Sequence, residues 1–153
     1  MNWRVLVHTK ESFADHHGDG VKKEACLAGV GGVNKARVGQ AYELTGSLTE
    51  TTVKSLADRL LADPVTQTAV VLPADRPARL ANGRRAEIWF KKGVADPVAD
   101  TVRLAAADLG VKGLEEVRSG RVFDFHGPVT PGAVRRFCED HLMNPLVQTV
   151  EVV

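Results

Sequence analysis

The chain has 153 residues and a nearly balanced charge, with 20 basic and 19 acidic side chains, which leaves no basic footprint for nucleic acid or anionic lipid. Two cysteines are too few for a disulfide framework, no apolar run reaches the roughly 20 residues of a membrane helix, and the first residues do not read as a signal peptide. We therefore expect a cytoplasmic protein made of one medium domain or two small ones.

The first part of the chain predicts a strand and then a helix. Apolar and β-favouring residues indicate a strand over 3–9. Asp15 is a good N-cap for the following helix, and Gly29 suits the left-handed position after its last turn. Poor helix formers follow the cap at His16, Gly18 and Gly20. We therefore expect this helix to start late or to fray.

The next part predicts a hairpin and a second helix. Two short strands, 33–38 and 41–45, flank Gly39, and a glycine between two such runs is typical of a hairpin turn. A second amphipathic helix and a last strand then complete this half of the chain. Their signals are a cap at Thr49, a helix stop at Asp63-Pro64 and a strand over 67–72.

The second half of the chain repeats the first. An offset of 81 residues places 4–72 on 85–153 without a gap and gives 20 identities in 69 positions, several times the roughly 6–8% expected by chance. The order strand, helix, strand, strand, helix, strand is therefore predicted twice, with Gly120 in the second hairpin. This is a ferredoxin-like α+β plan, βαββαβ. We divide the chain into module 1 (residues 1–72), a linker (73–84) and module 2 (85–153), and expect the modules to pack as an intrachain pseudo-dimer.

The sequence contains no pattern typical of an active site. His8, His16, His17 and Cys26 lack the spacing of zinc ligands. The glycines over 29–32 end a helix, whereas a phosphate-binding glycine loop opens one. Both cysteines align with alanine in the other module, which indicates packing rather than nucleophilic chemistry. We therefore expect no catalytic, cofactor-binding or metal-binding residue and no bound cofactor.

Some residues are repeated without an obvious structural need, and these are candidates for a partner interface. Arg37 and Arg118 close corresponding strands, and each can form a structural salt bridge or contact a partner. The proline that ends the second helix is repeated together with the Gln-Thr pair that follows it. The candidate set is Arg37, Gly39, Pro64, Arg118, Gly120, Asn144 and Pro145.

The order of these short motifs resembles the PurS family, the small subunit of phosphoribosylformylglycinamidine synthase. Module 2 carries the pattern more completely, in the segments Lys92-Gly93-Val94-Ala95-Asp96-Pro97, Leu109-Gly110, Val117-Arg118-Ser119-Gly120-Arg121 and Leu142-Met143-Asn144-Pro145. Module 1 keeps Asp15, Gly29, Ala36-Arg37-Val38-Gly39 and Leu61-Ala62-Asp63-Pro64, but has Glu-Ser-Phe in place of Lys-Gly-Val. The chain therefore resembles two tandem PurS-like modules.

The resemblance implies a non-catalytic subunit in de novo purine biosynthesis. In the family, a large synthetase subunit uses ATP to activate the amide of formylglycinamide ribonucleotide, and a glutaminase subunit supplies ammonia. The small subunit bridges the two and supports ammonia transfer, so both are expected partners, alongside self-association; neither nucleic acid nor membrane is expected. Such a double module can be freestanding or the N-terminal part of a fused large subunit.

A second hypothesis is a small-molecule sensor of the ACT type, in which paired ferredoxin-like modules bind an amino acid between them. Such a sensor has a glycine-bearing loop after the first strand of both modules. Gly93 fits this pattern, but Ser12 occupies the corresponding position of module 1, which disfavours the hypothesis. A stand-alone enzyme is disfavoured further, because no acid–base pair recurs or clusters.

Overall fold

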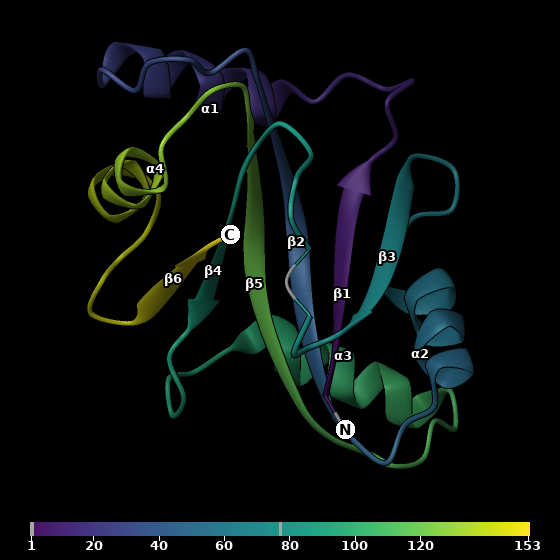
Figure 1. The fold of residues 1–153 in the computed structure, drawn as a ribbon. Helices are drawn as coiled ribbons and strands as arrows, with labels where there is room; N and C mark the ends of the chain where they lie inside the picture. The colour runs from purple at the N-terminus through teal and green to yellow at the C-terminus, as the bar shows by residue number, and fades with distance from the viewer. Residues whose placement is uncertain (1, 77) are drawn as a thin grey trace.

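The computed structural model describes residues 2–76 and 78–153 and has an α+β fold, with an antiparallel six-stranded sheet and helices packed on one of its faces (Figure 1). The first half forms β1 (Asn2–Thr9), α1 (His16–Leu27), β2 (Lys35–Gly46), α2 (Glu50–Leu56) with its π-helical continuation η1 (Ala57–Leu61), and β3 (Gln67–Pro73). The second half forms β4 (Gly83–Phe90), α3 (Pro97–Asp108), β5 (Leu114–His126), α4 (Pro131–Phe137) with its continuation η2 (Cys138–Leu142), and β6 (Gln148–Val152). No helix among the described residues is long and apolar enough to span a membrane.

The strand order β3-β1-β2-β5-β4-β6 places the two halves side by side in one sheet. The long strands β2 and β5 pair antiparallel at its centre. Gln40 faces Arg121 in this pairing, and the two residues occupy the same position of the 81-residue repeat. The modules are therefore related by an approximate two-fold axis that passes through this pair.

The hairpin predicted in each module is wrong, because β2 and β5 run without a break through Gly39 and Gly120. Neither glycine has a positive φ. A Cβ on Gly39 would lie 2.3 Å from the carbonyl oxygen of Val7, and one on Gly120 would lie 2.4 Å from that of Ile88. Glycine is needed here because a neighbouring strand approaches closely, not because the chain turns. Each module therefore has the order βαβαβ in place of the predicted βαββαβ.

Each of the two large hydrophobic cores is built from both modules. In the first core, Val21 and Ala25 of α1 belong to the same cluster as Phe123, Phe125 and Phe137 of module 2. In the second core, the equivalent helix α3 packs with β1, β2, α2 and η1 of module 1. The first helix of each module thus buries its apolar face in a core that the other module completes, and this burial holds the two halves together.

The first helix does not start late, contrary to the prediction. α1 begins at His16, directly after the cap, and has 12 residues, as α3 does. One oxygen of Asp15 accepts a hydrogen bond from the Gly18 N–H (2.9 Å), and the other accepts from the Val38 N–H on β2 (3.0 Å). Gly18 also lets the helix approach the sheet, since a Cβ there would lie 2.3 Å from the carbonyl oxygen of Ala36. The cap and this close approach outweigh the weak helix propensity of the first turn.

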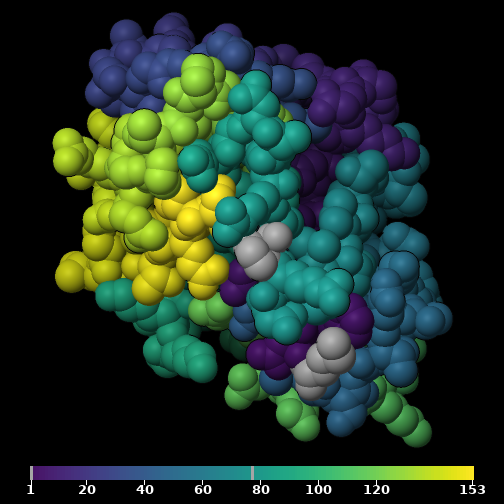
Figure 2. Space-filling view, in the orientation of Figure 1, coloured from purple at the N-terminus to yellow at the C-terminus, as the bar shows by residue number. Residues whose placement is uncertain are grey.

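The segment that connects the modules crosses the sheet face opposite the helices (Figure 1). Its described residues are 74–76 and 78–82, because β3 and β4 extend into both ends of the predicted linker, 73–84. In the space-filling view these teal residues lie across the front of the molecule, between the yellow C-terminal strand and module 1 (Figure 2). Ala78 and Leu72 pack on a small buried apolar cluster, which consists of Leu6, Ala41, Trp89 and Val122.

Candidate functional site

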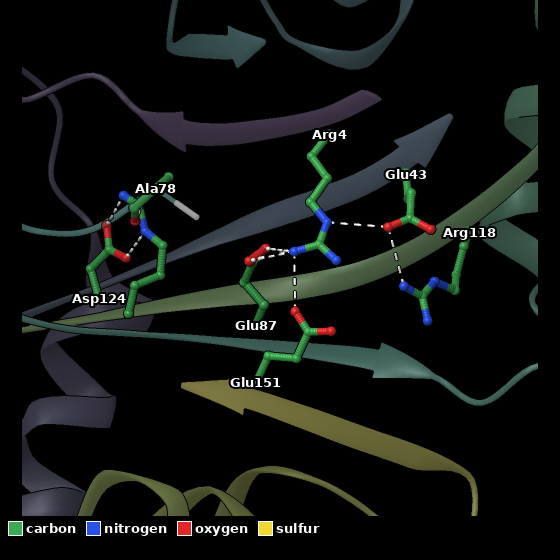
Figure 3. A network of polar contacts seen from close by, with 8 residues as sticks. Arg4, Glu43, Ala78, Glu87, Arg118, Asp124 and Glu151 are labelled. Carbon is green, nitrogen blue, oxygen red and sulfur yellow. Dashed lines mark hydrogen bonds and ion pairs between the residues drawn. The ribbon is translucent and has the colours of Figure 1, made fainter. Parts of the chain in front are cut away.

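The sheet face beneath the connecting segment carries a cluster of charged side chains drawn from both modules (Figure 3). Arg4 on β1 donates from Nε to Glu43 on β2 (3.1 Å). Its Nη1 donates to Glu87 on β4 (3.3 Å) and to Glu151 on β6 (3.1 Å). Arg118 on β5 donates to the same carboxylate oxygen of Glu43 (3.3 Å). The cluster therefore links five of the six strands across the boundary between the modules.

The cluster contains three carboxylates but only two guanidinium groups, and one of these carboxylates, that of Glu87, is buried. The side chain of Glu87 is almost fully buried. Burial raises the pKa of Glu87, and the positive charge of Arg4 offsets only part of this effect. The pKa of Arg4 is raised even though its burial acts in the opposite direction, because the surrounding carboxylates favour its charged form. Arg4 is therefore the positive charge with which all three carboxylates of the cluster form ion pairs.

A second ion pair lies at the two-fold-related position. Arg85 donates from Nε and Nη2 to the two carboxylate oxygens of Asp124 (2.7 and 2.9 Å), and its Nη1 donates to the carbonyl oxygen of Ala78 in the connecting segment (3.1 Å). His8 Nε2 lies 3.2 Å from Asp124 Oδ2. Burial alone would raise the pKa of Asp124, but the bonds from Arg85 and the neighbouring His8 outweigh it and hold that pKa at about 2. This carboxylate is therefore charged at neutral pH and tied to both modules.

The ring of Trp89 lies against both guanidinium groups of the first cluster. Its side chain is 0% exposed, and Arg4 and Arg118 lie 5.1 and 4.8 Å from the ring centroid. A cation over the face of an indole is attracted by the ring quadrupole. Module 1 has His8 at the equivalent position. The two modules therefore share a fold but differ in the side chain that packs at this point of the sheet.

The two repeated arginines of the candidate interface have different partners. Arg37 donates to the carboxylate of Glu11 and to the carbonyl oxygen of Thr9, and Glu11 also accepts from Lys35 (2.9 Å). Arg118 instead belongs to the charged cluster described above. Both arginines therefore form ion pairs within the chain, as the salt-bridge alternative requires. A contact of either one with a partner protein stays a prediction.

The candidate glycines and the candidate prolines lie in different surroundings. Gly39 and Gly120 are buried in the middle of the sheet. Pro64 lies in the turn between η1 and β3. There the Asp63 N–H donates to Gln67 Oε1 (2.9 Å), and the Val65 N–H donates to Asp63 Oδ1 (2.8 Å). The repeated glutamine is thus explained by the turn, which its side chain closes.

The equivalent turn of module 2 has the same hydrogen bonds. The Asn144 N–H donates to Gln148 Oε1 (2.9 Å), and the Leu146 N–H donates to Asn144 Oδ1 (3.0 Å). Leu146, next to Pro145, is 83% exposed, and Val65 of module 1 is 67% exposed. Each module therefore presents one apolar side chain on a hydrogen-bonded turn.

Comparison with known families adds a decisive observation. The family model PurS, described as phosphoribosylformylglycinamidine (FGAM) synthase, matches residues 2–73 and again residues 85–153. The chain belongs to the PurS family. The double match confirms two tandem PurS-like modules and links the chain to FGAM synthase and purine biosynthesis. No curated protein matched the chain.

The Asp-Pro motif of this PurS chain has a structural role. One oxygen of Asp96 accepts from the Ala99 N–H at the start of α3 (3.0 Å), and the other accepts from the Ser119 N–H on β5 (2.8 Å). Asp15 makes the same two contacts in module 1. The Asp-Pro motif therefore caps a helix and attaches it to the sheet, and Pro97 follows at the first helical position.

Sequence reasoning missed the charged cluster of this PurS chain. Arg4 and Arg85 are identical in the repeat, and Glu43 and Asp124 are also equivalent positions. Repeated arginines and repeated acids on strands expected to share a sheet are a detectable signal. Their pairing depends on the order of the strands in the sheet, which the sequence pattern did not predict.

The cysteines of the PurS chain differ in their surroundings. Cys138 is buried, and burial raises the pKa of its thiol to about 12, which keeps it protonated and unreactive at neutral pH. Cys26 is exposed, so the expectation that it packs in the core is wrong. Among the described residues, no group of three or more His, Cys, Asp or Glu side chains is arranged to hold a metal ion.

Proposed function

We propose that this chain acts as the non-catalytic small subunit, or the corresponding region, of FGAM synthase, bridging the synthetase and glutaminase subunits and supporting ammonia transfer. The observation that carries the proposal is the pair of turns that present Val65 and Leu146. A bridging protein needs two separate docking surfaces, and these turns offer one in each module. Both turns are held by their own hydrogen bonds, so little ordering entropy is lost on docking.

The two surfaces are similar in shape but differ in chemistry, which supports contact with two different partners. Asp63 precedes the proline of the first turn, and Asn144 precedes that of the second. Each turn leads into an outer strand, β3 or β6. The outer edge of such a strand presents backbone N–H and C=O groups to a partner. A difference in charge beside a similar apolar contact is a means of discriminating between partners.

The docking proposal is tested by placing a charge on each turn. Val65→Asp is expected to abolish binding to one of the two partner subunits, and Leu146→Asp to abolish binding to the other, measured by size-exclusion chromatography of the mixed subunits. Leu104→Asp is the matched control, because Leu104 is 66% exposed but lies on α3, which is part of neither turn. If the two turn variants and the control all form the ternary complex, the turns are not the docking surfaces.

Activity measurements test the bridging role itself. Added to the synthetase and glutaminase subunits, the chain is expected to raise glutamine-dependent amidation strongly, and to change ammonia-dependent amidation by the synthetase much less. The reason is that only glutamine-derived ammonia needs the glutaminase to be held beside the synthetase. Equal stimulation of the two reactions would argue against a role in ammonia transfer.

The proposal includes that the two modules form an intrachain pseudo-dimer, the counterpart of a homodimer of single PurS-like modules. The shared cores and the approximate two-fold axis support this. Expressed separately, residues 1–76 and 84–153 are expected to unfold at much lower temperature than the intact chain, because each loses a helix that completes its core. Mixing the halves should restore folding. Two halves that fold as stable monomers and ignore each other would refute the idea.

A further inference from the structure

A cavity of about 430 Å³ opens between the modules, near the ends of the central strands. Module 1 contributes Asn2 and Thr45 to its wall. Module 2 contributes Arg118 and the loop 91–94, in which Gly93 has a φ of +83°. A volume of this size accommodates a small metabolite. The cavity is distinct from the two turns proposed to dock other subunits.

The cavity is lined by four basic side chains, and several of their donors are free. The residues are Lys91, Lys92, Arg103 and Arg118. Neither lysine ammonium has a hydrogen bond or ion pair with a residue that the structure describes, and Arg103 has only an exposed contact with Asp100 (3.3 Å). The guanidinium of Arg118 is held by Glu43 and the Trp89 ring, but its Nη1 donates to no described residue. A held guanidinium with a free edge is suited to binding an oxyanion.

The acidic side chains in the same wall are mostly committed elsewhere. Asp96 accepts from the backbone of α3 and from both the N–H and the hydroxyl of Ser119 (2.8 and 2.6 Å). Glu43 accepts from two arginines. This leaves Glu116 as the one lining carboxylate with neither a hydrogen bond nor an ion pair to a described residue. Free cationic donors therefore outnumber free carboxylates.

At the place in module 1 that is equivalent to this cavity wall, a carboxylate of the chain pairs with the basic side chains. Glu11 stands where module 2 has Lys92, and it pairs with both Arg37 and Lys35. In module 1 a carboxylate thus satisfies the arginine that corresponds to Arg118. In module 2 the same place carries Lys92, and Arg118 pairs instead with Glu43 of module 1. The ammonium of Lys92 is left without a partner among the described residues.

From this arrangement we propose that the cavity binds a phosphate monoester of a small polar molecule. A phosphate monoester carries a charge of about −2 near neutral pH and offers three acceptor oxygens, which matches two lysines beside an arginine fork. The amide of Asn2 and the hydroxyl of Thr45 lie in the part of the wall that module 1 contributes, and they supply neutral hydrogen-bonding groups for the rest of the molecule. The inference does not depend on the bridging role, because binding is measured on the chain alone.

The test is a calorimetric titration of the full chain with ribose 5-phosphate, inorganic phosphate and glutamate, each at low ionic strength. Ribose 5-phosphate is expected to bind saturably at one site, inorganic phosphate more weakly, and glutamate more weakly still. Lys92→Glu, which copies the residue of module 1, is expected to weaken ribose 5-phosphate binding at least tenfold. Arg118→Lys keeps the charge but loses the planar fork, and it is expected to weaken binding as well.

Lys23→Glu is the matched control, because it makes the same charge change on the exposed face of α1, outside the cavity. It is expected to change the affinity less than twofold. Equal weakening by Lys92→Glu and Lys23→Glu would mean general electrostatic attraction and would overturn the proposal. Absence of saturable binding at millimolar ribose 5-phosphate would overturn it as well. Tight binding of glutamate alone would instead assign the cavity to an amino acid.

Discussion

The ion pair between Arg85 and Asp124 leads to a measurable pH dependence of stability. The pKa of Asp124 falls from its ordinary value of 3.8 to about 2 in the folded chain, a difference that corresponds to roughly 2 kcal/mol of stability. Because the folded pKa is the lower one, this stability is fully present above about pH 4. It is lost as the pH falls from about 4 to about 2.

Asp124→Asn removes the titrating group and also leaves the largely buried Arg85 without its counter-charge. Breaking a buried pair in this way costs about 3–5 kcal/mol. We therefore expect the variant to be less stable than the wild type by that amount at pH 7, and the gap to narrow by about 2 kcal/mol between pH 5 and pH 2. Urea unfolding followed by circular dichroism at a series of pH values measures both quantities.

The control for this experiment is Asp100→Asn, since Asp100 pairs with Arg103 on the exposed surface of α3. Exposed pairs contribute about 0–1 kcal/mol, so this variant should follow the wild type closely at every pH. If the wild type and Asp124→Asn lose stability in parallel from pH 5 to pH 2, folding does not favour the charged form of Asp124, and the reasoning fails.

Two further predictions concern glycines and cysteines. Gly120→Ala is expected to destabilise the chain by about 2 kcal/mol or more, because its Cβ would lie 2.4 Å from a backbone oxygen of β4. Gly20→Ala on α1, where a Cβ meets nothing within 4 Å, is expected to stabilise the chain by about 0.5–1 kcal/mol. Thermal unfolding of both variants measures these changes, and an equal loss of stability in both would contradict the packing argument. A disulfide reagent is expected to label the exposed Cys26 at once and the buried Cys138 only on unfolding, so rapid labelling of two thiols in the native chain would show that Cys138 is accessible.

The elements that could be predicted from the sequence are those determined by neighbouring residues. The caps at Thr49 and Asp96 each accept a hydrogen bond from a backbone N–H three residues further along, so a short window of sequence contains the whole signal. The turns that end the second helix of each module are equally local. The family could also be predicted, because the short motifs that resemble PurS recur in the same order in both modules.

The features that could not be predicted depend on residues far apart in the chain. Gly39 is compatible with a hairpin turn or a close strand approach, and only the position of Val7 on the neighbouring strand decides between them. The charged cluster joins Arg4 to Glu151, which are 147 residues apart. The cavity between the modules depends on the pairing of β2 with β5, and the predicted hairpins divided each of these long strands into two short ones.

The pairing of Gln40 with Arg121 at the two-fold axis has a consequence for how such a chain can change over evolutionary time. In an assembly of two identical subunits, a residue on the axis meets its own copy, so an arginine there would face an arginine. Covalent duplication removes this restriction, and each mutation then alters one side of the molecule only. The reversed charges at Glu11 and Lys92 and at Lys35 and Glu116 are changes of this kind. Two modules in one chain can therefore keep a symmetric architecture and still carry different chemistry on their two sides.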